Sequence, residues 1–157
     1  MQLWLVRHAL ALEREEFDGP DAERPLTRKG RRRFRKFCDR LLEGTGVPNA
    51  VITSPLVRAA DTAAILAKAA RIGKSEVVTT DPLAPGVDLT ALLEMVHEQP
   101  GERMALVGHE PDMSQMLSEL VGGGNFSFGK GFIAAVDFEG APTIGTGRLQ
   151  WLVGSKL

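Results

Sequence analysis

Residues 3–11 read LWLVRHALA, a short apolar run that leads directly into Arg7 and His8 before apolar residues resume. Four aliphatic or aromatic residues in a row are typical of a strand that is buried on both faces of a parallel sheet. A cation and an imidazole at the end of such a strand lie where a ligand, rather than the core, can reach them. The stretch therefore predicts a buried strand at residues 3–6 that carries Arg7 and His8 at its carboxyl end.

Further apolar runs predict three more strands of the same kind, at residues 50–53, 76–79 and 104–107. Closer to the C-terminus, residues 132–138 and 148–153 flank a turn rich in glycine and proline. Two such strands around a turn are typical of an antiparallel hairpin.

Helical spacing fills the segments between the predicted strands. The residues that start these helices are Thr27, Ser54 with Pro55, Asp88 or Thr90, and Pro111 with Asp112. Serine and threonine are favourable N-caps, and proline is favourable at the first helical position. Gly44 closes the first helix and the glycines 122–124 close the fourth. The second helix is expected over residues 56–71, and the third reaches His97, which we expect on an exposed face.

Alternating strands and helices followed by a hairpin indicate an α/β fold. We expect a three-layer α/β/α architecture, with a mostly parallel central sheet, helices on both faces and a C-terminal antiparallel hairpin. The sequence contains no internal repeat and no long linker, so the 157 residues are predicted to form a single domain, 1–157.

The composition is that of an ordinary globular protein, with 43% hydrophobic and 25% charged residues and a net charge of −1. It favours neither nucleic acid nor a membrane surface as a partner, and no apolar run is long enough to span a membrane. Cys38 is the only cysteine, which predicts a cytoplasmic protein. Residues 1–80 carry 15 Lys and Arg against 10 Asp and Glu, whereas residues 81–157 carry 4 against 10. This asymmetry favours an acidic or phosphorylated partner.

Polar residues of one chemical kind follow three of the predicted strands. Arg7 and His8 end the first, Ser54 ends the second with Arg58 one turn further on, and His109 ends the strand at residues 104–107. Ligands of parallel sheets bind beyond the carboxyl ends of the strands. Two histidines and two arginines that meet there need an anionic partner, and guanidinium groups match phosphate oxygens. The pattern therefore predicts a phosphate-binding site.

Four segments of the sequence, which contain these residues, resemble the motifs of a known family. They are residues 5–8 (LVRH), 25–30 (PLTRKG), 54–63 (SPLVRAADTA) and 107–111 (VGHEP). Together they resemble the motifs of the histidine phosphatase superfamily, in its phosphoglycerate-mutase-like branch, and the last resembles the form found in SixA-type phosphohistidine phosphatases. Ala9 stands where that family usually has glycine. The resemblance implies a phosphoglycerate mutase-like fold.

The resemblance also implies a mechanism that the chemistry of the residues supports. His8 would attack phosphorus and carry the phosphoryl group, and the two nearby guanidinium groups would lower its pKa and keep it unprotonated. Arg7, Arg58 and His109 would hold the phosphoryl oxygens, together with Ser54. Neither a metal nor another cofactor is implied.

The identity of a general acid stays open. Related enzymes that hydrolyse phosphate esters carry a glutamate after the third strand, but residues 81–86 (DPLAPG) contain none. Imidazole leaves phosphohistidine without a strong acid, so this absence favours a phosphohistidine substrate. Glu110 is the alternative donor, unless it only stabilises the start of the helix near Pro111. The resemblance implies a phosphorylated protein as partner, such as a histidine-containing phosphotransfer domain in signal transduction.

Two other functions stay open: a small-molecule phosphomonoesterase of the same superfamily, and a non-catalytic module that binds phosphoproteins. The basic run at residues 28–36 also has alternatives. It is the solvated face of a helix, a docking site for an acidic phosphoprotein, or a nucleic-acid site, the last disfavoured because no aromatic residues interleave with the cations.

Overall fold

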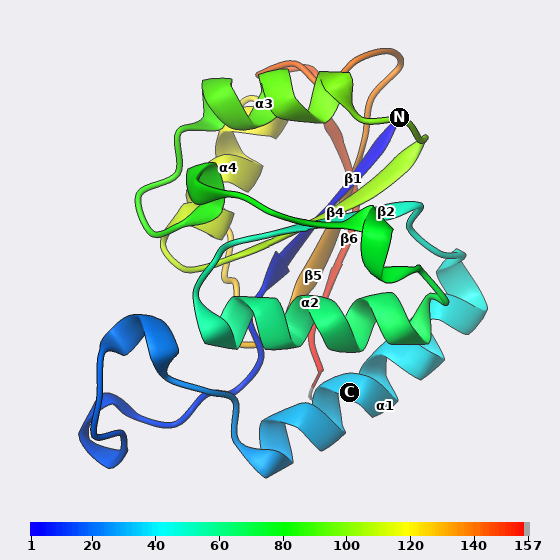
Figure 1. The fold of residues 1–157 in the computed structure, drawn as a ribbon. Helices are drawn as coiled ribbons and strands as arrows, with labels where there is room; N and C mark the ends of the chain where they lie inside the picture. Colours follow the sequence, from blue (N-terminus) through cyan, green and yellow to red (C-terminus); the bar gives the residue numbers. More distant parts are fainter. Residues whose placement is uncertain (156–157) are drawn as a thin grey trace.

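The computed structural model describes residues 1–155, which form a six-stranded sheet with α-helices packed on both faces (Figure 1). The strand order is β3-β2-β4-β1-β5-β6. Strands β1 to β4 are mutually parallel. Strand β5 is antiparallel to β1, β6 is antiparallel to β5, and these two strands extend the sheet beyond β1. The predicted three-layer α/β/α architecture with its C-terminal hairpin is confirmed.

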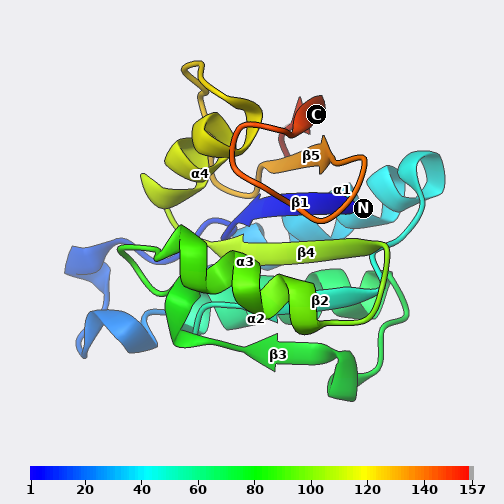
Figure 2. The same ribbon diagram turned by 90° about the horizontal axis from the view of Figure 1, so that it is seen from above.

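The predicted strands are present with small shifts at their ends. They are β1 Gln2–Arg7, β2 Ala50–Thr53, β3 Val77–Thr79, β4 Arg103–Gly108, β5 Ile133–Asp137 and β6 Arg148–Val153. The two central strands, β1 and β4, are buried along nearly their whole length, as their continuous apolar sequences require. Figure 2 shows the strands side by side, with the carboxyl ends of β1 to β4 at one edge.

Two pairs of helices cover the two faces of the sheet (Figure 1). On one face lie α1 (Arg28–Thr45) and α2 (Val57–Ala69), and on the other lie α3 (Leu89–Glu98) and α4 (Asp112–Val121). Each face has its own apolar core, because alternate residues of the strands point to opposite sides. Leu5 packs toward α3 and α4, whereas its neighbours Trp4 and Val6 pack toward α1 and α2.

Two predicted helix starts are confirmed. The hydroxyl of Thr27 accepts a hydrogen bond from the backbone N–H of Gly30 at 2.8 Å. The carboxylate of Asp88, rather than Thr90, caps α3 by accepting from the N–H of Ala91 at 3.1 Å. His97 lies on an exposed face of α3, as expected.

Two predicted helix boundaries, the end of the first helix and the N-cap of the second, are wrong by a few residues. Helix α1 continues through Gly44 and ends at Thr45, because the positive φ that ends a helix (78°) is adopted by Gly46 instead. Helix α2 begins at Val57, so Ser54 is not its N-cap. The hydroxyl of Ser54 instead accepts from the N–H of Leu56 in the turn before the helix and faces His109.

A long connection, residues 8–27, joins the end of β1 to the start of α1. It contains two short 3₁₀ turns, Arg14–Glu16 and Asp21–Glu23, and a bridge between Ala11 and Leu26 ties its ends together. Two more such turns, Lys74–Glu76 and Asp81–Leu83, flank β3. In residues 1–155, no helix has the length and apolar character that crossing a membrane requires.

Candidate active site

The parallel register of the sheet brings the predicted site residues to one edge. Arg7, the last residue of β1, pairs with Gly108, the last residue of β4. The backbone N–H of His8 donates to the carbonyl of Gly108 at 3.0 Å, and the N–H of Ser54 donates to the carbonyl of Val107 at 3.0 Å. Three strand ends are thereby tied together directly below the functional side chains.

The two histidines lie side by side at this edge. The ring centroids of His8 and His109 are 5.4 Å apart, with the rings tilted by 55°. Both are buried, with 7% and 3% of their surface exposed, and Arg58 is 6% exposed. The positive charges of Arg7 and Arg58 act on both rings. The structure thus brings together the four residues that the sequence predicted to converge.

One backbone hydrogen bond fixes the ring of His8. Its Nδ1 lies 2.7 Å from the carbonyl oxygen of Ala9. Because a carbonyl oxygen only accepts, Nδ1 carries the proton, and Nε2 of the neutral ring holds the lone pair. Burial is the main cause that lowers the pKa of His8 to about 3; the nearby His109, Arg58 and Arg7 contribute in the same direction, and the Ala9 carbonyl opposes them. His8 is therefore a neutral imidazole near pH 7, with a nucleophilic Nε2.

The orientation of His109 depends on Ser54. Its Nε2 lies 2.8 Å from the Ser54 hydroxyl, which is fully buried and accepts a hydrogen bond from the N–H of Leu56. When the hydroxyl donates its own proton to Nε2, Nδ1 of His109 carries the ring proton; when Nε2 donates to the hydroxyl instead, Nδ1 has the lone pair. Burial lowers the pKa of His109 to about 4, and the charge of Arg58 contributes. His109 is thus a neutral imidazole rather than a cation near pH 7.

Both guanidinium groups are held by groups from distant parts of the chain. Arg7 donates from Nη1 to the carbonyl oxygen of Phe128 at 2.8 Å. Arg58 donates from Nη1 to the carbonyl oxygen of Asp21 at 2.9 Å and from Nη2 to its carboxylate at 3.1 Å. Arg24 also donates to the Asp21 carboxylate, at 3.0 Å. The connection of residues 8–27 therefore lies against the cationic edge of the sheet.

The site contains buried nitrogens that have no hydrogen-bond partner in residues 1–155. They are Nε of Arg7, Nε of Arg58 and Nδ1 of His109. Buried N–H groups almost always have an acceptor in native proteins, and each exception calls for an explanation. Two guanidinium donors and an imidazole nitrogen without partners, in one cluster of neutral histidines and cationic arginines, fit the oxygens of a tetrahedral anion.

Thr62 connects the loop after β1 with α2. Its hydroxyl accepts from the N–H of Ala9 at 3.0 Å and donates to the carbonyl oxygen of Arg58 at 2.7 Å. It is fully buried, and it fixes the backbone that carries His8 relative to the helix that carries Arg58. In the sequence, Thr62 belongs to the motif at residues 54–63, but its spacing alone indicates no role.

Glu110 follows His109 but is occupied at the start of α4. Its two carboxylate oxygens accept from the backbone N–H and the hydroxyl of Ser114, at 2.8 and 2.9 Å. Glu110 is also close enough to Arg7 for its negative charge to oppose the lowering of the Arg7 pKa by burial. These contacts favour the structural alternative for Glu110, stabilising the first turn of the helix.

Two further residues of the site were missed from the sequence. Asp21 belongs to a polar connection without periodicity, where nothing marks one carboxylate among several. Phe128 contributes a backbone carbonyl, which carries no side-chain signal, from a glycine-rich stretch that leads into the hairpin. Within residues 1–155, no three His, Cys, Asp or Glu side chains are grouped so that they could hold a metal ion.

The fold is similar to those of solved phosphatases. The protein histidine phosphatase SixA in complex with tungstate has a TM-score of 0.84 at 24% identity, over 99% of this chain and 98% of that one. A mycobacterial glucosyl-3-phosphoglycerate phosphatase has a TM-score of 0.68 at 16% identity, over 95% and 96%. At these identities the likeness concerns the fold, and it includes enzymes named for very different substrates.

The sequence comparisons are more specific. An uncharacterized protein of Picosynechococcus sp. is 36% identical over 126 residues, which cover 78% of this chain and 74% of that protein. Residues 3–84 match the model of the histidine phosphatase superfamily (branch 1). This match spans more than half of the chain and includes Arg7, His8 and Arg58, which the structure brings together with His109. The protein belongs to the histidine phosphatase superfamily, branch 1.

Proposed function

We propose that the protein is a protein-phosphohistidine phosphatase that acts through a phosphohistidine intermediate on His8. The observation that carries this proposal is the fixed ring of His8, whose Nδ1 proton is held by the Ala9 carbonyl at 2.7 Å. The other nitrogen is then unprotonated beside two arginines and a second histidine, which is the arrangement that nucleophilic attack on a phosphoryl group requires.

In the first step, the lone pair of His8 Nε2 forms a bond to phosphorus while the bond from phosphorus to the substrate nitrogen breaks. The substrate imidazole leaves as a neutral ring after taking a proton from solvent on its other nitrogen. In the second step, a water oxygen bonds to phosphorus and loses a proton to solvent, and the electron pair of the P–N bond returns to Nε2. Inorganic phosphate leaves, and His8 is restored.

The hydrogen bond to Ala9 assists the second step. Because Nδ1 keeps its proton throughout, the phosphorylated ring is cationic and departs from phosphorus as neutral imidazole without any proton transfer. Arg7 and Arg58 supply positive charge to the phosphoryl oxygens, and His109 donates one neutral hydrogen bond. This set provides the charge stabilisation of a loose phosphoryl-transfer transition state, so the proposal includes no resident metal.

The proposed substrate is phosphohistidine on a protein, such as a phosphotransfer domain of a cytoplasmic signalling relay. Two observations support it. Residues 81–86 carry no glutamate after β3, and the nearby Asp112 is engaged by the N–H of Gly86 at 2.8 Å. A site without a strong acid suits imidazole as leaving group better than an alcohol. The structural similarity to a phosphatase named for protein histidine adds to this.

A substrate panel tests the proposal. The measured quantity is kcat/KM for phosphate release. We expect it to be at least about a hundredfold higher for a phosphorylated phosphotransfer domain than for sugar phosphates and glycerate phosphates. The reverse order would favour the alternative, a small-molecule phosphomonoesterase. Absence of turnover with every member of the panel, with vanadate still bound, would favour the non-catalytic binding module.

The variant His8→Ala tests the covalent step. We expect it to abolish turnover and the acid-labile labelling of the protein by phosphohistidine substrates, while vanadate still binds to the unchanged Arg7, Arg58 and His109. His97→Ala removes an exposed histidine on α3 and should keep wild-type turnover and labelling. Wild-type rates in the His8 variant would overturn the mechanism.

A further inference from the structure

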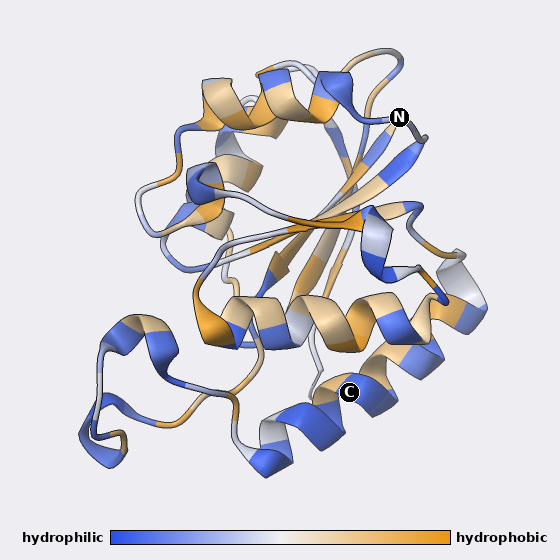
Figure 3. Cartoon of the chain, viewed as in Figure 1, coloured by the Kyte–Doolittle hydropathy of each residue, from blue (hydrophilic) through white to orange (hydrophobic). Residues whose placement is uncertain are grey.

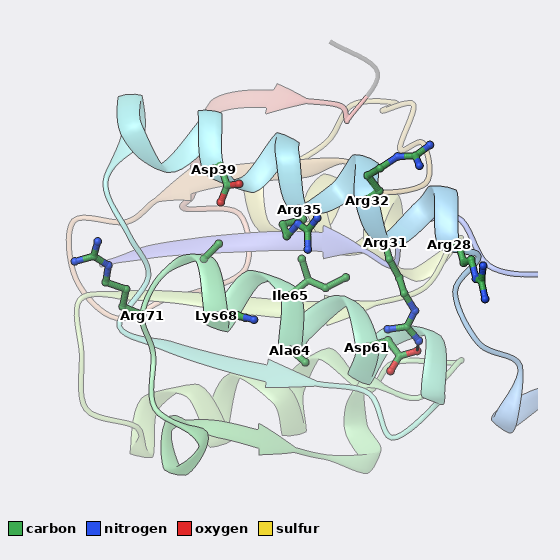
Figure 4. Close-up of a pocket in the computed structure, with 11 residues that line it drawn as sticks. Arg28, Arg31, Arg32, Arg35, Asp39, Asp61, Ala64, Ile65, Lys68 and Arg71 are labelled. Atoms are coloured by element: carbon green, nitrogen blue, oxygen red, sulfur yellow. Dashed lines mark hydrogen bonds and ion pairs between the residues drawn. The ribbon is translucent and has the colours of Figure 1, made fainter.

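A groove runs between α1 and α2, on the outside of the sheet face that these helices cover (Figure 4). Its volume is about 680 Å³, and it is lined only by residues from these two helices and the turn after α2. None of the proposed catalytic residues lines it. It is therefore a second concave feature of the molecule, separate from the active site.

Positive charge dominates this groove. Its lining includes six cations, Arg28, Arg31, Arg32, Arg35, Lys68 and Arg71, against the two carboxylates of Asp39 and Asp61. Among residues 1–155 the only one of these cations within 4.0 Å of a carboxylate is Arg31, which pairs with Asp61. Like charges that face one another across a concave surface repel, and an anionic ligand relieves that repulsion.

The geometry of α1 separates the groove from an ordinary solvated face. Successive residues of a helix turn by about 100°, so the 18 residues of α1 form stripes along its length. Phe34, Phe37 and Cys38 belong to the buried stripe. Arg28, Arg31, Arg32 and Arg35 form a second stripe, which lines the groove; Arg31 and Arg35 extend toward α2 (Figure 4). Lys29, Arg33, Lys36 and Arg40 form a third, which faces away from the groove. The basic run at residues 28–36 thus serves two surfaces: one stripe lines this groove, whereas Arg33 of the other lines a separate hollow with Lys130.

The floor of the groove is apolar. Ala64, Ile65 and Ala69 of α2 line it beneath the cations (Figure 4). A floor of this kind beneath rims of arginine and lysine matches an amphipathic helix with an apolar edge and acidic flanks.

One end of the groove lies near the candidate active site. Helices α1 and α2 run in the same direction, and their N-terminal ends lie at the edge of the sheet where β1 to β4 end (Figures 1 and 4). Arg58, which lies in the first turn of α2, is three residues before Asp61 in the groove. A helix lying in the groove would therefore have one end near the phosphoryl-binding side chains.

We propose that this groove docks an acidic amphipathic helix of the phosphorylated protein substrate. The inference rests on the proposed function for the identity of the partner, but not for the binding itself. It assigns a role to the basic face of α1, and it explains how a site that recognises only a phosphoryl group could select among phosphoproteins.

A binding experiment tests the docking directly. The probe is a fluorescent amphipathic peptide helix with glutamates on its polar face, and the proteins are wild type, Arg35→Glu/Lys68→Glu in the groove, and Lys36→Glu/Arg40→Glu on the other stripe. Both double variants make the same change in net charge. We expect the groove variant to weaken binding about tenfold or more and the control variant less than about twofold. A glutamine version of the peptide should bind weakly to all three proteins.

Equal weakening in the two variants would overturn the proposal, because it would show only long-range attraction to a basic molecule. Preference for a single-stranded oligonucleotide over the acidic peptide would overturn it as well. Circular dichroism and turnover of a small phosphate ester, both unchanged, show that the variants are folded, since all four positions are exposed.

The same variants separate this inference from the proposed function. With a phosphohistidine joined to the acidic helix, we expect the groove variant to lower kcat/KM about tenfold through KM, with kcat retained. Peptide binding that needs the groove, without hydrolysis of any phosphohistidine, would overturn the function and leave the docking surface standing. Hydrolysis of phosphohistidine at the same rate with and without the acidic helix, together with absence of peptide binding, would overturn the docking surface and leave the function standing.

Discussion

At the scale of single residues, the chemistry of the site depends on which ring nitrogens carry protons. The Ala9 carbonyl places the His8 proton on Nδ1. In the proposed mechanism, the Ser54 hydroxyl donates to Nε2 of His109, so that ring carries its proton on Nδ1 as well. One ring then presents a lone pair and the other an N–H donor. Burial keeps both rings neutral. The proposed mechanism therefore gives the pair two different tasks although the side chains are identical.

Removing the Ser54 hydroxyl should affect His109 and the N–H of Leu56, which are its two hydrogen-bond partners. We expect Ser54→Ala to lower kcat/KM about tenfold, since Nδ1 of His109 is no longer fixed as a donor, and to weaken vanadate binding by a similar factor. The measurement is steady-state kinetics combined with nitrogen NMR of the His109 tautomer. Ser54→Thr keeps the hydroxyl and should restore activity. A tautomer that does not change in Ser54→Ala would contradict this role.

Glu110 offers a comparison of leaving groups. Because its carboxylate accepts two hydrogen bonds from Ser114, we expect Glu110→Gln to lower the melting temperature by a few degrees. If it also acts as an acid, the variant slows hydrolysis of an alkyl phosphate about tenfold and that of phosphohistidine far less. Equal effects on the two substrates remove the acid role and leave only the structural one.

At the scale of elements, the connection of residues 8–27 links the active site to α1. Its ends are joined by the bridge between Ala11 and Leu26, and Arg24 holds it by donating to the carbonyl of Leu12 at 2.6 Å. Asp21 extends from it to Arg58. The connection thus places a carboxylate on a guanidinium that the proposed mechanism uses for phosphate.

Asp21 and a bound phosphoryl group are both anions that interact with Arg58. We expect Asp21→Asn to make inorganic phosphate a severalfold stronger inhibitor, because one negative charge beside the guanidinium is removed, and to lower stability by about 1 kcal/mol. Inhibition constants and urea unfolding are the measurements. Asp18→Asn, in the same connection, is the control. Weaker inhibition by phosphate in the Asp21 variant would show that the carboxylate positions Arg58 instead.

At the scale of the whole molecule, the uneven charge of the sequence corresponds to the two faces of the sheet. Helices α1 and α2, which belong to the basic N-terminal half, cover one face, and α3 and α4 cover the other (Figure 3). Hydrophilic residues dominate the outer side of α1 in this view. The fold therefore concentrates cations on one side of the protein, beside the edge that carries the active site.

Stability should depend on pH through the two buried histidines. In the unfolded chain both titrate near 6.5, whereas in the folded protein the pKa values are about 3 for His8 and about 4 for His109. Below pH 6.5 the unfolded state binds more protons, so the free energy of unfolding falls as pH falls. The slope is at most about 1.4 kcal/mol per pH unit for each histidine.

Urea unfolding between pH 7 and pH 4 measures this dependence. His109→Gln removes one of the two titrating groups and should reduce the slope by about half, provided that the variant is folded at pH 7. A slope in the variant equal to that of the wild type would contradict the assignment of the dependence to the buried histidines.

The sequence by itself determined the order of elements and the residues that meet at the sheet edge. Apolar runs such as residues 3–6 and 104–107 define buried strands because they have no polar face, and parallel strands bring the residues after their carboxyl ends to one edge. Arg7, His8, Arg58 and His109 could be predicted together for that reason. Thr27 as a cap depends only on its own neighbours, so it too was predictable.

Only the tertiary structure decided the contacts between segments that are distant in the chain. The pairing of Asp21 with Arg58, the bridging hydroxyl of Thr62 and the Phe128 carbonyl on Arg7 each join such segments. No local pattern encodes them, because a polar side chain in a loop has the same sequence signature whether it faces water or another element. The groove between α1 and α2 has the same origin: periodicity indicated a basic face, but packing made part of it concave.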